Sequence, residues 1–181
     1  MTATLPPPPL DYEQRMPRYQ DAQDLTDIGR DMFGRACRLS RDAADAWMQM
    51  RSAAERAGVC LLLISGFRSR DRQEEIVRKK IEAGLPMDTI LRSVAYPGYS
   101  EHHTGGAVDL CSPDCAHLTE DFERTRQFEW LRNHAQEFGF RLSYPRANPR
   151  SVTYEPWHWM WWKGSPNPGG CVPREPAHDP R

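Results

Sequence analysis

Hydrophobic residues follow two patterns along the chain, and the two patterns predict different elements. Apolar residues three or four apart predict helices, whereas short continuous or alternating apolar runs predict strands. The helical spacing predicts helices over residues 22–37, 41–57, 71–83, 87–94 and 125–139. Short apolar runs predict strands over residues 59–65, 107–110, 140–144 and 152–162. Helices gather early and strands late, which favours an α+β fold over a doubly wound sheet.

The predicted helices differ in how many signals support them. The helix over residues 22–37 depends on spacing alone, and its apolar face would consist of Leu25, Ile28, Met32 and Ala36. The next helix also has end signals, because Ser40 can cap its N-terminus and Gly58 can end it. Gly139 closes the last helix in the same way.

The two ends of the chain differ from its middle in composition. Residues 1–18 contain the run Pro6–Pro9, which favours polyproline II, and are expected to form an irregular N-terminal arm. Residues 164–181 are rich in Pro and Gly and are expected to form a loose tail. Residues 19–163 are expected to form one domain, since a chain of 181 residues leaves little room for two.

Composition excludes several classes of partner. Lys and Arg number 24 against 25 Asp and Glu, so no basic excess favours nucleic acid. The longest apolar run, residues 59–64, is too short for membrane insertion. The N-terminus does not have the pattern of a secretory signal, so a cytoplasmic location is expected, or a periplasmic one if the N-terminus is truncated. Five cysteines, an odd number, are interpreted as free thiols.

Candidate chemistry is concentrated in SEHHTGGAVD, residues 100–109. A catalytic zinc ion usually takes three protein ligands and leaves one position open. His102 or His103 could supply one ligand and Asp109 another. The two glycines between them let the chain turn sharply, so that loop and strand can converge on one ion. A third ligand must then come from another segment.

The segment YEPWHWMWW offers His158 as the third ligand and Glu155 as a general base. In a regular strand, residues three apart face opposite sides, so both could face one cleft only if the strand is irregular. Pro156 indicates such an edge or bulge. Each motif alone is better explained by ordinary structure, namely a polar turn, a surface Glu–His pair and tryptophans of the core and its rim.

Three motifs together resemble a known family. SEHHTGGAVD fits Ser-x-His-x-x-Gly-x-Ala-x-Asp, EPWHW fits Glu-x-x-His-Trp, and SGFRSRDRQ at residues 65–73 fits a Ser-Gly-aromatic-Arg segment with a later glutamine. They resemble the zinc D-alanyl-D-alanine carboxypeptidases of the vancomycin-resistance type, within the LAS metallopeptidases. The motifs come in the family's order. The resemblance implies a small antiparallel sheet that carries the zinc site, with helices packed on it, as in LAS and hedgehog-like folds.

The resemblance also implies a role for each motif residue. One zinc ion would be bound by His102, Asp109 and His158, and His102 is selected over His103 by its distance from Ser100. Glu155 would be the catalytic base. Arg68 would stabilise the substrate carbonyl or hold a carboxylate. The substrate-binding residues would be Gln73, Ser100, His103, Trp157 and Trp159.

The implied enzyme is a zinc metallopeptidase, a hydrolase that releases C-terminal D-alanine from peptidoglycan stem peptides or muropeptides. Family members differ in the bond they cut. Some are L,D-carboxypeptidases on tetrapeptides, others D,D-carboxypeptidases on D-Ala-D-Ala ends, and others phage-type endopeptidases. A cytoplasmic enzyme would meet recycled tetrapeptides, which favours L,D-carboxypeptidase activity in cell-wall recycling, with D,D activity next.

Three other interpretations remain. Two histidines and a carboxylate also describe non-haem iron(II) oxygenases, but those sites commonly have one residue between His and Asp, and here six intervene. A non-catalytic zinc binding module would be expected to have no base such as Glu155. A structural zinc at Cys111, Cys115 and His117 would be one ligand short.

Overall fold

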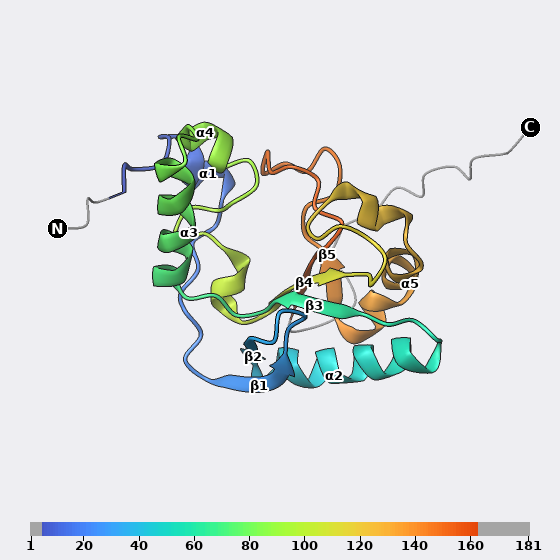
Figure 1. The fold of residues 1–181 in the computed structure, drawn as a ribbon. Coiled ribbons are helices and arrows are strands. Elements are labelled where there is room, and N and C mark those ends of the chain that lie inside the picture. Colours follow the sequence, from blue (N-terminus) through green and yellow to red (C-terminus); the bar gives the residue numbers. More distant parts are fainter. Residues whose placement is uncertain (1–4, 163–181) are drawn as a thin grey trace, which may run out of the picture.

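The computed structural model describes residues 5–162, which form an α+β fold with two antiparallel sheets (Figure 1). The strands are β1 (Leu25–Arg30), β2 (Ala36–Ser40), β3 (Leu62–Ser65), β4 (Ala107–Cys111), β5 (Phe140–Leu142) and β6 (His158–Trp161). The α-helices are α1 (Tyr12–Arg15), α2 (Arg41–Arg56), α3 (Arg70–Glu82), α4 (Met87–Ile90) and α5 (Arg126–His134). Three 3₁₀-helices are η1 (Glu101–Thr104), η2 (Glu120–Arg124) and η3 (Ala135–Phe138). The predicted α+β class is confirmed.

The larger sheet has the strand order β3-β4-β6-β5, with every neighbouring pair antiparallel. All five residues of β4 are buried, which agrees with a strand covered on both faces. The main core lies between this sheet, α2 and α5, and Trp47 and Met50 of α2 are fully enclosed in it. The helices α1, α3 and α4 lie together on the other side of the molecule (Figure 1).

The helix predicted over residues 22–37 is wrong, because this segment forms the hairpin of β1 and β2. The Asp31 carboxylate accepts hydrogen bonds from the backbone N–H groups of Phe33 and Arg35 and shapes the turn. Gly34 in that turn has φ +78° and Gly29 in β1 has φ +97°. Local hydrogen bonding by aspartate and the two left-handed glycines therefore override a helical spacing of apolar residues.

The strand predicted over residues 152–162 is confirmed only for His158–Trp161. Glu155 precedes it in a turn, where the His158 N–H donates to the Glu155 carbonyl oxygen at 3.1 Å. Glu155 is therefore outside the alternation of the strand. Glu155 and His158 can therefore face the same cleft although they are three residues apart.

Part of the predicted N-terminal arm forms a short helix. Residues Tyr12–Arg15 form α1, and Tyr12 and Met16 are buried against Leu91 and Tyr99 in a second, smaller apolar cluster. The predicted tail over residues 164–181 lies outside the described residues. No helix within residues 5–162 is long and apolar enough to cross a membrane.

Gly105 lies between η1 and β4, and the connection of these two elements requires a glycine. Its φ is +67°, and an added Cβ would lie 2.7 Å from the backbone nitrogen of Ser40. Gly84 has a similar left-handed conformation, φ +85°, but nothing within 4 Å of such a Cβ. An alanine at either position would have a strained backbone, but only an alanine at position 105 would also overlap with a neighbouring atom.

We expect Gly105→Ala to lower the free energy of unfolding by about 1–3 kcal/mol more than Gly84→Ala, because it adds a backbone overlap to the strain that both share. Urea-induced unfolding of the two metal-free variants measures the difference. Equal losses would show that β2 moves away from Gly105 at no cost.

Candidate metal centre and active site

Three potential metal ligands from distant parts of the sequence meet at β4 and β6. His102 lies in η1, Asp109 lies in β4, and His158 is paired with Asp109 across the antiparallel ladder. His102 Nε2 is 3.1 Å from Asp109 Oδ2, and His158 Nδ1 is 2.9 Å from Asp109 Oδ1. All three residues are buried, and their ligand atoms lie within 4.8 Å of one another. The set could hold one metal ion.

The nitrogens of the two histidines that face away from Asp109 have partners of their own. His102 Nδ1 is 2.7 Å from the Gly66 carbonyl oxygen, and His158 Nε2 is 3.0 Å from Glu101 Oε2. A carbonyl or carboxylate can only accept, so these nitrogens carry the imidazole protons. His102 Nε2 and His158 Nδ1 therefore both face Asp109, and each would offer a lone pair to a metal ion once it carries no proton.

Burial and charge shift the ionisation of all three residues. Burial opposes the charged form of Asp109, but the two imidazoles outweigh it and hold the pKa of this carboxyl far below its ordinary value. Burial also opposes the charged form of His158, yet hydrogen bonds to Asp109 and Glu101 raise its pKa to about 10. Burial lowers the pKa of His102. The metal-free site thus holds a positive charge on His158 between two carboxylates.

Glu155 lies beside the three ligands and is buried, with its backbone N–H bonded to the Tyr144 carbonyl oxygen at 3.1 Å. Burial raises the pKa of Glu155 to about 8, an effect that Asp109 increases and that His158 and Arg68 oppose. A carboxylate with a raised pKa in a buried site is a stronger base than an exposed one. A divalent cation at the ligand set would favour its ionised form.

Arg68 carries the positive charge on the opposite side of Asp109. Its guanidinium donates to Gln73 Oε1 at 3.0 Å and to Ser65 Oγ at 3.1 Å, and Nη2 lies 3.5 Å from Asp109 Oδ2. The Gln73 amide in turn donates to the Ala95 carbonyl oxygen at 2.7 Å. Arg68 is therefore held in place while its side chain remains about 20% exposed toward the cavity.

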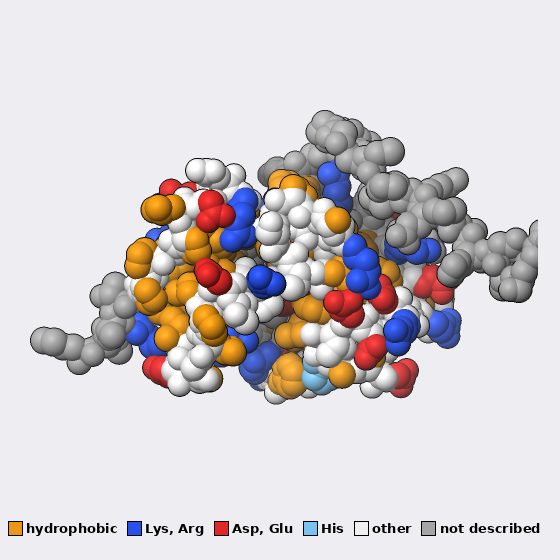
Figure 2. Space-filling model, turned by 90° about the horizontal axis from the view of Figure 1, so that it is seen from above, with side chains coloured by type: hydrophobic (Ala, Val, Ile, Leu, Met, Phe, Trp, Pro, Cys, Tyr) orange, Lys and Arg blue, Asp and Glu red, His pale blue; other side chains and the backbone are white. Residues whose placement is uncertain are grey.

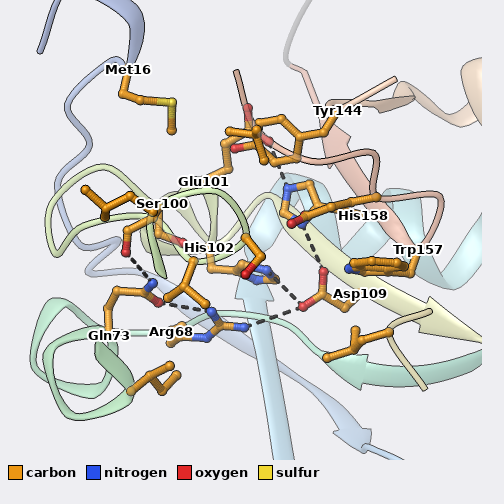
Figure 3. Close-up of a pocket in the computed structure, with 18 of the residues that line it drawn as sticks. Met16, Arg68, Gln73, Ser100, Glu101, His102, Asp109, Tyr144, Trp157 and His158 are labelled. Carbon is orange, nitrogen blue, oxygen red and sulfur yellow. Dashed lines mark hydrogen bonds and ion pairs between the residues drawn. The ribbon is translucent and has the colours of Figure 1, made fainter. Parts of the chain in front are cut away.

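A cavity of about 390 Å³ opens over these groups (Figure 3). Its polar wall includes Arg68, Gln73, Lys80, Ser93, Ser100, Glu101, His102, Asp109, Tyr144, Glu155 and His158. Its apolar wall includes Met16, Ile76, Leu91, Val94, Val152 and Trp157. Viewed from above, the molecule is hollowed between the half with α1, α3 and α4 and the half with α5 (Figure 2).

Two residues predicted to bind substrate do not line this cavity. His103 is fully buried, with Nδ1 2.6 Å from the Arg68 carbonyl oxygen and Nε2 accepting the Gly98 N–H at 3.0 Å. Trp159 is buried in the main core, where its Nε1–H donates to the Pro156 carbonyl oxygen. Both side chains hold the backbone around the site, so the interpretation of His103 and Trp159 as substrate-binding residues is corrected.

The other predicted site residues border the cavity, and two residues that sequence reasoning missed join them. Glu101 contacts His158, and the Tyr144 ring lies 5.0 Å from the His158 ring, centroid to centroid. The position of Glu101 directly before the motif histidine His102 indicates from the sequence that it lies near the site. Nothing in the sequence around Tyr144 indicates its position.

The possible structural zinc site at Cys111, Cys115 and His117 is not formed. Within residues 5–162, the one group of three or more metal-ligating side chains close enough to share an ion is His102, Asp109 and His158. The four cysteines in this range, Cys37, Cys60, Cys111 and Cys115, are free thiols.

Comparison with known proteins gives the same assignment as the motifs. The family model described as VanY, D-alanyl-D-alanine carboxypeptidase, matches residues 36–164. YodJ of Bacillus subtilis (strain 168), named for an inferred carboxypeptidase activity, is 38% identical over 66% of this chain. The match spans 45% of the length of YodJ, so the chain covers less than half of that relative.

Two solved structures share the fold. The LdcB LD-carboxypeptidase aligns with a TM-score of 0.69 and 32% identity, over 78% of this chain and 69% of that one. A variant of the vancomycin-resistance D,D-pentapeptidase VanY, in complex with Zn(II), aligns with a TM-score of 0.61 and 28% identity, over 78% and 80%. With the family model matched from β2 to beyond β6, the chain belongs to the VanY family of D-alanyl-D-alanine carboxypeptidases.

Proposed function

We propose that this protein is a zinc-dependent carboxypeptidase that releases the C-terminal D-alanine of peptidoglycan stem peptides. The observation that carries the proposal is the convergence of His102, Asp109 and His158 on one point, in a cavity that also contains Glu155 and Arg68. Metal-assisted amide hydrolysis uses a bound cation, a base and a donor for the carbonyl oxygen; the three ligands would hold the cation, Glu155 would be the base and Arg68 the donor.

The donor set fits one zinc ion. Zinc binds imidazole nitrogen and carboxylate oxygen, and its catalytic sites keep a position open beside three protein ligands. The Zn(II) complex of the related VanY supports this choice of metal. When bound, zinc supplies polarisation of the substrate carbonyl and a lowered pKa of water.

Glu155 would act as the base and then as the acid. Its carboxylate would take a proton from the attacking water and return it to the amide nitrogen of the departing D-alanine. Burial supports this role, because it keeps the carboxylate basic near neutral pH. Trp157 would wall this part of the cavity and exclude solvent.

Arg68 would donate to the carbonyl oxygen as negative charge develops on it, or hold a substrate carboxylate. Gln73 would hold Arg68 in position, since both polar ends of its amide are already engaged, by Arg68 and by Ala95. Ser100, a buried residue on the cavity wall, would bind the substrate terminus.

Between the two carboxypeptidase activities, we propose L,D-carboxypeptidase activity on tetrapeptides first. The LdcB LD-carboxypeptidase, with a TM-score of 0.69, supports this order over the D,D-pentapeptidase VanY, with 0.61. D,D-carboxypeptidase activity remains the alternative, favoured by the description of the matching family model. A role in the recycling of cytoplasmic tetrapeptides stays a prediction.

Zinc-loaded protein should release alanine from a soluble tetrapeptide muropeptide and leave a pentapeptide ending in D-Ala-D-Ala largely uncut, as mass spectrometry of the digests would measure. Trimming of the pentapeptide alone would establish the D,D alternative. If neither loses alanine while zinc stays bound, the carboxypeptidase proposal is wrong.

Glu155→Gln should reduce turnover about 100-fold or more and leave zinc affinity nearly unchanged, because it removes the base and keeps the ligands. Rates of alanine release and zinc content after dialysis measure the two effects. Glu137→Gln is the matched control, since the Glu137 side chain is 63% exposed and lies away from the cavity lining. Equal loss of rate in both variants, or loss of zinc from Glu155→Gln alone, would contradict the assignment.

Zinc binding should release at least one proton at pH 7. The pKa of His158 is raised to about 10 in the metal-free protein, so this imidazole is protonated below that pH and must lose the proton to bind metal. Affinity should therefore rise about tenfold per pH unit between roughly pH 6.5 and 8. Titration calorimetry in buffers of different ionisation enthalpy counts the protons, and a count of zero would show that His158 is neutral before metal binds.

A further inference from the structure

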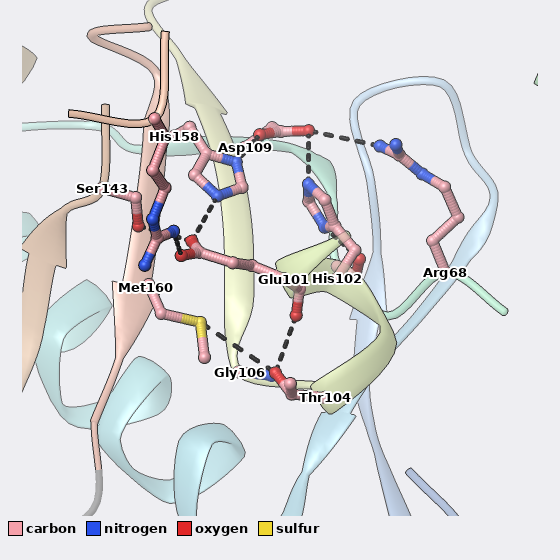
Figure 4. Close-up of polar contacts among 11 residues, drawn as sticks. Arg68, Glu101, His102, Thr104, Gly106, Asp109, Ser143, His158 and Met160 are labelled. Carbon is pink, nitrogen blue, oxygen red and sulfur yellow. Dashed lines mark hydrogen bonds and ion pairs between the residues drawn. The ribbon is translucent and has the colours of Figure 1, made fainter. Parts of the chain in front are cut away.

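Glu101 is the most enclosed carboxylate next to the candidate metal site, and the chemistry proposed above does not use it. Its side chain is 1% exposed. Oε2 accepts from Ser143 Oγ at 2.5 Å and lies 3.0 Å from His158 Nε2, and Oε1 accepts from Arg150 Nη1 at 2.5 Å. Figure 4 shows the Glu101 side chain between Ser143 and His158, with Asp109 beyond the imidazole ring.

These contacts exclude Glu101 from direct proton transfer to substrate. Both carboxylate oxygens are engaged by side chains of the protein, and the residue is almost completely enclosed although it borders the cavity. An effect of Glu101 on catalysis would therefore pass through the ring that it touches, which is the imidazole of His158.

The backbone of Glu101 is held as firmly as its side chain. Thr104 Oγ1 donates to the Glu101 carbonyl oxygen at 2.7 Å, and the Gly106 N–H donates to Thr104 Oγ1 at 3.0 Å (Figure 4). Glu101 and the ligand His102 are neighbours in η1. The same short helix thus fixes one ligand directly and the other through a carboxylate.

The loop that carries Arg150, and so places it against Glu101, has two residues in a strained backbone conformation. Ala147 and Ser151 have φ values of 57° and 55°, a left-handed region that costs such residues about 1 kcal/mol or more each. Asn148 offsets this cost, because its side chain donates to the carbonyl oxygens of Pro145 and Val152 and accepts from the Arg150 N–H. The Arg150 carbonyl oxygen also accepts from the Arg15 side chain at 2.8 Å.

A carboxylate bonded to the outer N–H of a metal-binding histidine fixes the tautomer and orientation of the ring and increases its basicity. In this protein the bond between Glu101 and His158 leaves Nδ1 as the nitrogen that faces Asp109. Arg150 and Ser143 both donate to the carboxylate of Glu101, which in turn contacts the ring of His158.

We propose that Glu101 is a positioning residue for metal binding, which holds His158 with Nδ1 toward the ion, and that Arg150 acts on the metal through Glu101. The inference rests on the proposed metal ligands His102, Asp109 and His158. It makes the loop of residues 143–152 part of the metal site, although that loop supplies no ligand.

The first test is the zinc affinity of Glu101→Gln, measured by competition with a chromophoric chelator. Glutamine keeps the shape and one acceptor oxygen but loses the charge that Arg150 and His158 share. Affinity should fall about 10- to 100-fold, whereas the exposed control Glu137→Gln should bind zinc like the unaltered protein. Circular dichroism and urea unfolding of the metal-free variants separate weak binding from misfolding.

A double-mutant cycle tests whether Arg150 acts through Glu101. The change in zinc affinity that Arg150→Met causes in the unaltered protein should disappear when Glu101→Gln is already present, because the carboxylate that Arg150 binds is then absent. If the fold-losses of zinc affinity in the two single variants multiply in the double variant, Arg150 acts on the metal independently of Glu101, and that half of the proposal is overturned.

The unaltered protein provides a measurement that needs no variant. Long-range ¹H–¹⁵N NMR of the zinc-loaded protein should show His158 protonated at Nε2 and bound to metal through Nδ1, and a proton on Nδ1 would overturn the proposal. Absence of zinc binding to the unaltered protein would instead refute the proposed function. Tight binding with an unchanged affinity in Glu101→Gln would refute this inference alone.

Discussion

The structure of the site depends on one buried carboxylate between two imidazoles. Asp109 is only 5% exposed, and an ionised group at such a position is tolerated only when it is paired and hydrogen-bonded. Its partner His158 lies directly opposite it in the antiparallel pair of β4 and β6, so the register of these strands creates the contact. A slip of one residue would turn Asp109 to the other face of the sheet. The close approach of Gly105 to Ser40 positions η1, and with it His102, against the same strand.

Acidic and basic side chains are paired throughout this site. Three carboxyl groups, Glu101, Asp109 and Glu155, are buried within one small region. Arg150 pairs with Glu101 and Arg68 with Asp109, and burial raises the pKa of Glu155 to about 8. In the metal-free protein a proton on His158 lies between the carboxylates of Glu101 and Asp109. A divalent ion would replace that proton and interact favourably with every carboxylate around it. The residues that pair with one another without metal are therefore the same ones that could hold a metal ion.

The sequence predicted the convergence of His102, Asp109 and His158 better than the helices and strands around them. His102, Asp109 and His158 belong to short motifs, and the turns at Gly105 and Gly106 made their convergence foreseeable. The hairpin of β1 and β2 was missed, because apolar spacing favoured a helix and the turn at Asp31 was given too little weight. His103 was assigned to the cavity by analogy, although both of its ring nitrogens bond to backbone groups. Contacts such as Arg150 with Glu101 join residues 49 positions apart, and no local pattern encodes them.

The cavity has a floor formed by strands and a 3₁₀-helix, and its walls come partly from segments outside the helices and strands. The floor consists of β4, β6 and η1, which carry the ligands, whereas Met16, Tyr144 and Val152 of the walls lie outside the strands and helices. Changes in the walls can alter the shape of the cavity without moving His102, Asp109 and His158, because backbone outside a sheet tolerates substitution and insertion. Arg150 links the wall to the floor of the cavity, because it binds Glu101 and Glu101 contacts His158. A change in the loop of residues 143–152 that moved the Arg150 guanidinium would also alter the support of His158. This part of the wall is therefore less free to change than the rest.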